Sequence, residues 1–213
     1  MEILKMILDF FLHIDKNLAL VTAQYGTMTY LILFLVIFME TGLVVTPFLP
    51  GDSLLFAAGA LAAMGSFDFW ILYPLMLVAA IVGDTVNYWI GDKFEKSVFE
   101  RGSKIFKKEY LEQAEEFYRK YGGRAIVFAR FVPIVRTFAP FVAGISKMHY
   151  GDFIKYNMVG GFAWVSLFLG GGFLFGNLPV VKENFHYLVL GIIVVSLVPI
   201  FVEVRKRRKS VIK

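Results

Sequence analysis

The apolar residues of this 213-residue chain are gathered into long runs. The runs cover residues of about 27–46, 52–64, 70–90, 125–145, 154–176 and 186–203. An α-helix needs about 20 residues to cross the hydrocarbon core of a bilayer, so the run 52–64 is too short to span it. The pattern predicts an all-α integral membrane protein with transmembrane helices at about 70–90, 154–176 and 186–203.

Helix-breaking residues interrupt the other apolar segments. They are Pro47, Pro50 and Gly51 between the first two runs, and Pro133 and Pro140 inside the fourth. Proline and glycine end or kink helices, and broken backbone at membrane depth is tolerated only inside protein or beside a cavity. The sequence therefore predicts two re-entrant helical hairpins, at about 27–64 and 124–147.

The basic residues predict how these segments are oriented. Nine Lys/Arg lie within residues 92–124, and six more lie in the tail, residues 205–213. Cytoplasmic loops carry such an excess, so both regions are expected on the cytoplasmic side. An even number of crossings must separate them. Since three apolar segments intervene, one of them, the second hairpin, should enter and leave on the same side.

Two segments have charged and apolar residues on opposite helical faces. Residues 1–24 place acidic, basic and histidine side chains every three or four positions, with an apolar face between them. This spacing predicts an amphipathic helix on the membrane surface, and residues 108–121 predict a similar connecting helix. The membrane domain itself is expected to cover residues 25–204.

The two predicted hairpins resemble each other in sequence. Phe48-Leu-Pro50 parallels Phe131-Val-Pro133, and Phe56-Ala-Ala-Gly59 parallels Phe141-Val-Ala-Gly144. Because one span and the cytoplasmic stretch lie between them, the second hairpin should enter from the opposite side. This order predicts an inverted-topology repeat, which in secondary transporters has its binding site at the repeat interface. A chance match between two Phe/Ala/Gly-rich segments is the alternative.

Composition excludes several classes of function. Hydrophobic residues make up 58% of the chain and charged residues 18%, which does not fit a soluble domain. The chain has no cysteine, and its histidines, His13, His149 and His186, lack metal-ligand spacing, so no cofactor or metal is expected. The net charge of +5 is concentrated in the tail, directly after the last apolar run. This position is typical of a basic segment at the cytoplasmic end of a membrane span, and it argues against nucleic-acid binding.

Four charged residues lie inside the broken apolar segments. Glu40 and Asp52 flank the first break, and Arg130 and Arg136 flank Pro133 in the second. A charge at the bilayer centre costs at least about 2.5–3.5 kcal/mol, so such residues are commonly functional. Guanidinium groups pair well with phosphate, and burial of a carboxylate favours its protonated form. The predicted roles are phosphate binding by the arginines and proton transfer by the acids.

Other interpretations of these positions stay open. The four charges are also compatible with structural ion pairs, or with arginines that reach the membrane interface. Asp84 is a second candidate for a proton relay, or a hydrated residue near a helix end. Glycines 170–172 and Gly176 favour helix packing over substrate contact.

These residues together resemble the DedA family of membrane proteins, which share the VTT domain. The similarity covers about 27–176, and its motifs are Glu40 followed by Pro47-x-x-Pro50-Gly51-Asp52, Gly83-Asp84-x-x-x-Tyr88-x-x-Gly91, Arg130-Phe131-x-Pro133-x-x-Arg136-Thr137-x-x-Pro140, Ala143-Gly144, Asn157, Gly160 and Trp164. One departure is Asp92, where the family often has a basic residue.

The resemblance implies facing re-entrant hairpins and proton-linked lipid transport across the cell membrane for envelope homeostasis. The implied substrates are undecaprenyl phosphate or phospholipids such as phosphatidylethanolamine. It also implies that Glu40, Asp52, Arg130 and Arg136 are functional positions. Membrane lipids and protons are the expected partners, and a homo-oligomer is compatible with the sequence.

Three other functions compete with lipid transport. A proton-coupled exporter of small cations would use the paired carboxylates. A scaffold or assembly factor would need the charged residues only for folding or partner binding. A lipid phosphatase would need a nucleophile and base, for which the sequence offers only His149 with Asp152, so an enzyme is not expected.

Overall fold

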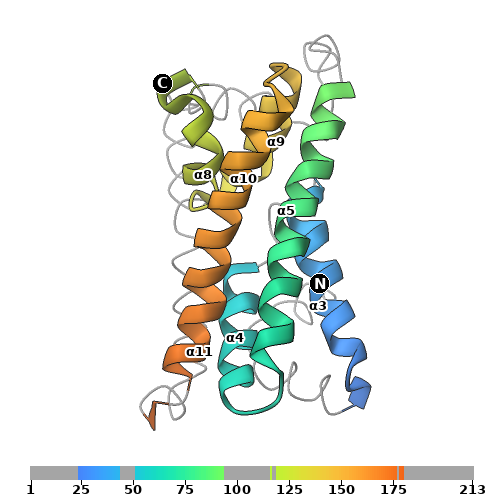
Figure 1. Cartoon of the computed structure of the whole chain (residues 1–213), viewed down its shortest axis with the longest axis vertical. Coiled ribbons are helices and arrows are strands. Elements are labelled where there is room, and N and C mark those ends of the chain that lie inside the picture. The colour runs from blue at the N-terminus through green and yellow to red at the C-terminus, as the bar shows by residue number, and fades with distance from the viewer. Residues whose placement is uncertain (1–23, 44–50, 94–115, 117–118, 177, 180–213) are drawn as a thin grey trace, which may run out of the picture. The chain divides into compact units, whose positions relative to one another are not determined.

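The computed structural model describes residues 24–43, 51–93, 116, 119–176 and 178–179, and every regular element in them is helical (Figure 1). The elements, in chain order, are α3 (Met28–Gly42), α4 (Gly51–Ala63), α5 (Phe69–Lys93), η1 (Gly122–Arg124), α8 (Ala125–Ala129), α9 (Pro133–Ile145), α10 (Tyr150–Val165), η2 (Ser166–Gly170) and α11 (Gly171–Phe175). The fold is therefore all-α, as predicted.

Within the described residues, two continuous helical segments are long and apolar enough to cross a membrane. They are α5, with 25 residues, and Tyr150–Phe175, with 26, which joins α10, η2 and α11. At about 1.5 Å per residue each exceeds the roughly 30 Å hydrocarbon core. They confirm the long apolar helices predicted at 70–90 and 154–176. The predicted helices at 1–24 and 186–203 and the basic tail lie outside the described residues.

The first predicted helix break separates α3 from α4. Helix α3 ends at Gly42 and α4 begins at Gly51, while Pro47 and Pro50 lie outside the described residues. Helix α4 ends at Ala63 and is followed by the left-handed Gly65, with φ +86°, where the Ser66 amide donates to Leu61 O and the Gly65 amide donates to Ala62 O. These two bonds cap the helix and turn the chain toward α5.

The second break lies between α8 and α9. Val132 is extended, with φ −118° and ψ 105°, because the residue before a proline disfavours helix, and Pro133 then begins α9. Pro140 was predicted to break the segment, and this prediction is wrong: α9 continues through Pro140 to Ile145. Pro140 has no amide hydrogen and so removes one hydrogen bond from α9, but the packing of α9 is close enough for the helix to continue through the proline.

The chain divides into two compact units. Within the described part, the first comprises residues 24–32, 51–74, 165–176 and 178–179, and the second comprises 33–43, 75–93, 116 and 119–164. Helices α3 and α5 contribute residues to both units, as does the segment that joins α10 to α11. Each unit is built around one short helix, α4 in the first and α9 in the second.

In the first unit, α4 packs against the η2–α11 segment beside it (Figure 1). The contact depends on two glycines, one on each side. A Cβ on Gly59 would overlap the carbonyl oxygen of Leu169, and a Cβ on Gly172 would overlap that of Phe56. Only glycine permits this approach of two backbones.

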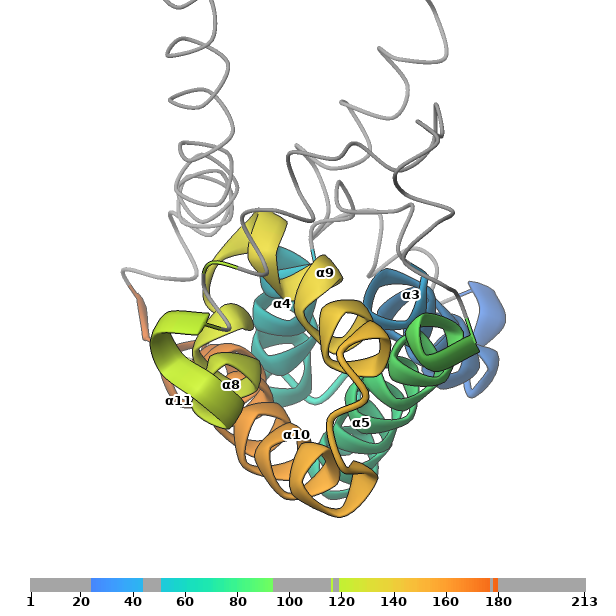
Figure 2. The ribbon, with the colours of Figure 1, turned by 90° about the horizontal axis from the view of Figure 1, so that it is seen from above.

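In the second unit, α9 packs against the end of α5 in the same way (Figure 2). A Cβ on Gly144 would overlap the carbonyl oxygen of Tyr88, and a Cβ on Gly91 would overlap that of Phe141. The Phe-x-x-Gly sequences that suggested a repeat thus make equivalent backbone contacts in their own units. In α9 this glycine lies about one turn nearer the C-terminus than Gly59 does in α4.

The end of α9 also follows the pattern of α4. Met148 donates to Ala143 O and Lys147 donates to Gly144 O, with Lys147 in the left-handed region at φ 55°. The Lys147 ammonium then donates to the Asp92 carbonyl, at 2.6 Å, and to its carboxylate, at 2.8 Å. Asp92, the departure from the family pattern, therefore has a basic partner across the helix contact.

Candidate functional site

Arg130 is buried in the second unit at the end of α8. Its Nη2 donates to Oδ2 of Asp84 and to Oδ1 of Asn157, each 2.5 Å away, and lies 3.4 Å from the Ala80 carbonyl. Its side chain is 4% exposed and that of Asp84 is 5%. Within the described part of the chain, the buried Nε has no hydrogen-bond partner. A buried donor without an acceptor is costly, so this nitrogen offers a contact to a ligand.

Asn157 fixes the position of that guanidinium. Its Nδ2 donates to the Ile81 carbonyl at 3.0 Å and lies 3.4 Å from the Thr85 hydroxyl, so its oxygen is left to accept from Arg130. On the same helix, a Cβ on Gly160 would lie 3.0 Å from Cδ and 3.1 Å from Nε of Arg130. Glycine there leaves room for the arginine side chain.

Arg136 lies in the first turn of α9 and pairs with Glu40 on α3 through its Nη2. Glu40 is 2% exposed and Arg136 is 11% exposed. No side chain caps the start of α9, whose preceding residue is Val132. The positive end of the helix dipole therefore lies beside a cationic side chain, an arrangement that favours a nearby anion.

Trp164 on α10 lies beside both arginines. Its ring centre is 5.9 Å from Cζ of Arg130 and 5.4 Å from Cζ of Arg136, within cation–π range. The side chain is fully buried, at 1% exposure. One indole therefore supports both guanidinium groups, and the residues at 157, 160 and 164 share a face of α10 because they are spaced by three and four.

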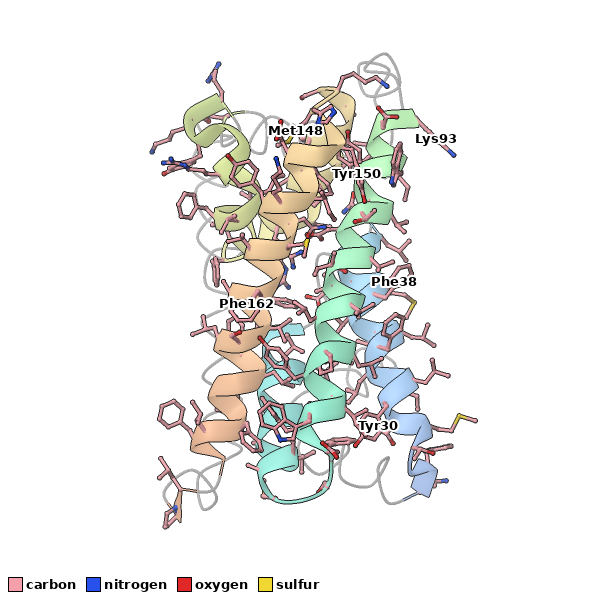
Figure 3. All side chains as sticks on the ribbon, in the orientation of Figure 1. Tyr30, Phe38, Lys93, Met148, Tyr150 and Phe162 are labelled. Carbon is pink, nitrogen blue, oxygen red and sulfur yellow. The ribbon has the colours of Figure 1, made fainter. Side chains whose placement is uncertain are left out.

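The helices around the arginines are joined by Asn87 and Tyr88 on α5. Asn87 donates from Nδ2 to the carbonyls of Thr41, at 3.0 Å, and Thr137, at 2.9 Å, and so links α3 to α9. The Tyr88 hydroxyl donates to the carbonyl of Met148, and the Tyr88 ring centre lies 5.6 Å from that of Tyr150. Figure 3 labels Met148 and Tyr150. These contacts connect α3, α5 and α9 around the charged groups.

The structure brings together four of the five predicted charged residues. Glu40, Asp84, Arg130 and Arg136 lie in the second unit as two ion pairs. Asp84 was a secondary candidate in the sequence, yet it is the carboxylate bound to Arg130. Asp52 belongs to the first unit, half-buried in the first turn of α4.

Sequence reasoning named Asn157, Gly160 and Trp164 as motif positions, and Trp164 as an interfacial or helix-packing tryptophan, but gave none of them a part in the charged site. Their spacing along one helical face was a usable signal, but only contact with Arg130 gives it meaning. No group of three residues able to hold a metal occurs among the described residues. The His149 side chain is exposed, and Asp152 pairs with Lys155 at 3.5 Å.

Comparison with known proteins identifies the family. The VTT domain model matches residues 49–174, which include Asp84, both arginines and Trp164. The chain belongs to the VTT-domain family. Its DedA-type relatives extend the match to the whole chain: Protein DedA of Escherichia coli K12 is 52% identical over 213 residues, covering 99% of this chain and 97% of the relative.

Other VTT-domain relatives are named as membrane proteins. An uncharacterized membrane protein of Mycobacterium leprae is 41% identical, covering 77% of this chain and 74% of its own. The inner membrane protein YqjA of E. coli K12 is 33% identical, covering 72% and 70%. No solved structure matches the chain. This protein is therefore a DedA-type VTT-domain membrane protein.

Proposed function

We propose that the protein transports a phosphate-bearing lipid across the cell membrane, with Arg130 and Arg136 binding the headgroup. The observation that carries this proposal is that buried Arg130 and partly buried Arg136 share Trp164 beside the uncapped start of α9. Guanidinium groups, helix N-termini and a low-dielectric setting all favour a phosphate.

The position of Arg136 distinguishes this proposal from a purely structural ion pair. A cation near a helix N-terminus interacts unfavourably with the helix dipole, by about 0.3–1 kcal/mol. A structural pair would be more stable with the acid on α9 and the base on α3. The observed order instead places the cation of the pair beside the positive end of the α9 dipole. That arrangement suits the capture of an anion.

Protons are the proposed coupling ion, with Glu40 and Asp52 as their carriers. Glu40 is buried and paired with Arg136, so it lies directly beside the arginine proposed to bind the headgroup. Asp52 also has a structural role besides proton coupling, because an acidic side chain in the first turn of α4 stabilises that helix through its dipole. Two opposed re-entrant hairpins, a cytoplasmic C-terminus and a homo-oligomer complete the proposal.

The equivalent glycine contacts of α4 and α9 support the inverted repeat within this proposal. Transporters of this design open the same site to each side in turn by moving one repeat against the other. A small-cation exporter would need its carboxylates for the cation. Both acids that are buried in the described part of the chain bind arginines, so the geometry favours an anionic headgroup.

The test is headgroup accessibility in liposomes that contain the purified protein. Labelled undecaprenyl phosphate and labelled phosphatidylethanolamine form separate arms, because either is a candidate substrate. We expect transport of at least one lipid, lost in Arg130→Ala and reduced in Glu40→Gln. Arg124→Ala is the matched control, since this arginine is exposed. Unchanged transport in Arg130→Ala, or equal loss in Arg124→Ala, would contradict the assignment.

A further inference from the structure

The charges of the buried cluster balance. Among the described residues, its ionisable members are Asp84 on α5, Arg130 after α8, Arg136 on α9 and Glu40 on α3. Three other ionisable groups near these helices are accounted for: Tyr88 donates to the Met148 carbonyl, Asp92 pairs with Lys147, and His149 is exposed. Among the described residues of the second unit, two cations and two anions give the cluster no net charge.

This balance restricts how an anion can enter. A headgroup that binds both arginines would add its negative charge to two carboxylates already beside them. Uncompensated charge in a low-dielectric site is strongly unfavourable. The charge has to be cancelled on the carboxylates, because the guanidinium groups are always protonated.

We propose that the site loads its headgroup without change in net charge, with the phosphate taking the place of Asp84 and Glu40 on the two arginines. The displaced carboxylates bind about one proton for each unit of net negative charge that the headgroup brings. This inference rests on the proposed lipid-phosphate function. It adds Asp84, on the side of Arg130, to Glu40 and Asp52 as a proton-binding residue.

Asn157 and Trp164 let Arg130 stay in place during this exchange. When Asp84 becomes neutral, the Nη2 of Arg130 keeps Asn157 as an acceptor, and Asn157 is itself held by the Ile81 carbonyl. The Trp164 ring supports the guanidinium from its face. Asn157 and Trp164 are therefore positioning residues, and the carboxylate is the partner that exchanges.

The charge of the headgroup then sets the proton count. A dianionic phosphate monoester requires about two protons, and a monoanionic phosphodiester about one. In phosphatidylethanolamine the ammonium offsets the phosphate, so about zero protons are required. The ammonium pairs with a released carboxylate instead.

Titration calorimetry of the full chain in detergent tests this count directly. Short-chain phosphatidic acid, phosphatidylglycerol and phosphatidylethanolamine are titrated at a pH where phosphatidic acid is dianionic. Each titration is repeated in two buffers of different ionisation enthalpy, so that the heat difference reports the protons taken up. We expect about two, one and zero protons, respectively. In Asp84→Asn the first two counts fall by about one, whereas Asp92→Asn, which removes a partly exposed carboxylate paired with Lys147, leaves all three unchanged.

The outcomes separate this inference from the proposed function. Binding of phosphatidylglycerol without proton uptake, or an unchanged count in folded Asp84→Asn, would overturn electroneutral loading and leave lipid-phosphate binding intact. Failure of all three lipids to bind would count against the proposed function itself. If Asp84→Asn does not fold, Glu40→Gln provides the second variant, and the wild-type series of three lipids decides alone.

Discussion

Arg130 donates to Asp84 on α5 from the same nitrogen, Nη2, that donates to Asn157 on α10. One guanidinium nitrogen thus joins an ionic acceptor and a neutral acceptor from two different helices. The ionic acceptor balances the charge, and the neutral one fixes the geometry. The Nε of the same side chain stays available for a ligand within the described structure.

Loss of the Asp84 carboxylate should strongly destabilise the protein. In Asp84→Ala the buried Arg130 loses its charge partner, and breaking a buried pair costs about 3–5 kcal/mol. Asp84→Asn keeps an acceptor oxygen and should cost less. Thermal unfolding in detergent measures both. Asp92→Ala is the control, because its exposed pair with Lys147 contributes about 0–1 kcal/mol. Equal losses in Asp84→Ala and Asp92→Ala would show that the Arg130 pair contributes little.

Gly160→Ala should impair transport through Arg130. The added Cβ would lie 3.0 Å from Cδ of Arg130 and 3.2 Å from Cα of Val127, so the arginine side chain must shift. Displacement of a positioning group by a fraction of an ångström lowers the rate, here by about tenfold. Gly171→Ala is the matched control. Apart from the neighbouring backbone of its own helix, no heavy atom lies within 4 Å of a Cβ placed on Gly171. Initial transport rates in liposomes distinguish the two, and equal rates would show that Arg130 tolerates the shift.

Trp164→Leu should weaken headgroup binding more than Trp164→Phe does. Leucine removes the aromatic face from both guanidinium groups, whereas phenylalanine keeps part of it, and each cation–π contact contributes about 0.5–2 kcal/mol. The measurement is the dissociation constant for short-chain phosphatidylglycerol. Trp89→Leu controls for the loss of a tryptophan, since this side chain is 44% exposed. If the leucine and phenylalanine variants bind alike, the ring face does not support the arginines.

Much of the fold was predictable because the membrane imposes simple rules on sequence. Length and apolarity identified α5 and the α10–α11 segment, and proline with glycine identified both breaks. Pro140 was misjudged, because a proline tolerated inside a packed helix has the same local sequence signal as one that breaks it. Local rules report helix-breaking tendency, and tertiary packing decides its outcome.

The charged residues were found as individuals, but not as pairs. An intramembrane charge is visible in sequence because it is rare and costly. Its partner is not, because pairing depends on which helical faces meet. Asp84 and Asn157 come to Arg130 from α5 and α10, 46 and 27 residues away along the chain. No period or motif in the sequence encodes those two separations.

The reciprocal glycine contacts predict equal sensitivity in the two units. Alanine usually stabilises a helix relative to glycine by up to about 1 kcal/mol. At Gly59 and at Gly144, however, the added methyl group would overlap a backbone carbonyl oxygen, of Leu169 and of Tyr88, respectively. A backbone cannot rotate away as a side chain can, so the two helices must separate.

We therefore expect Gly59→Ala and Gly144→Ala each to lower the free energy of unfolding by about 1–3 kcal/mol, the usual cost of overpacking. Gly171→Ala, which meets open space, should leave it unchanged or raise it slightly. Thermal unfolding of the three variants in one detergent makes the comparison. If only one of the first two loses stability, the two Phe-x-x-Gly contacts are not mechanically equivalent. Equal losses would mean that both short helices, α4 and α9, are held by the same backbone approach, as an internal repeat requires.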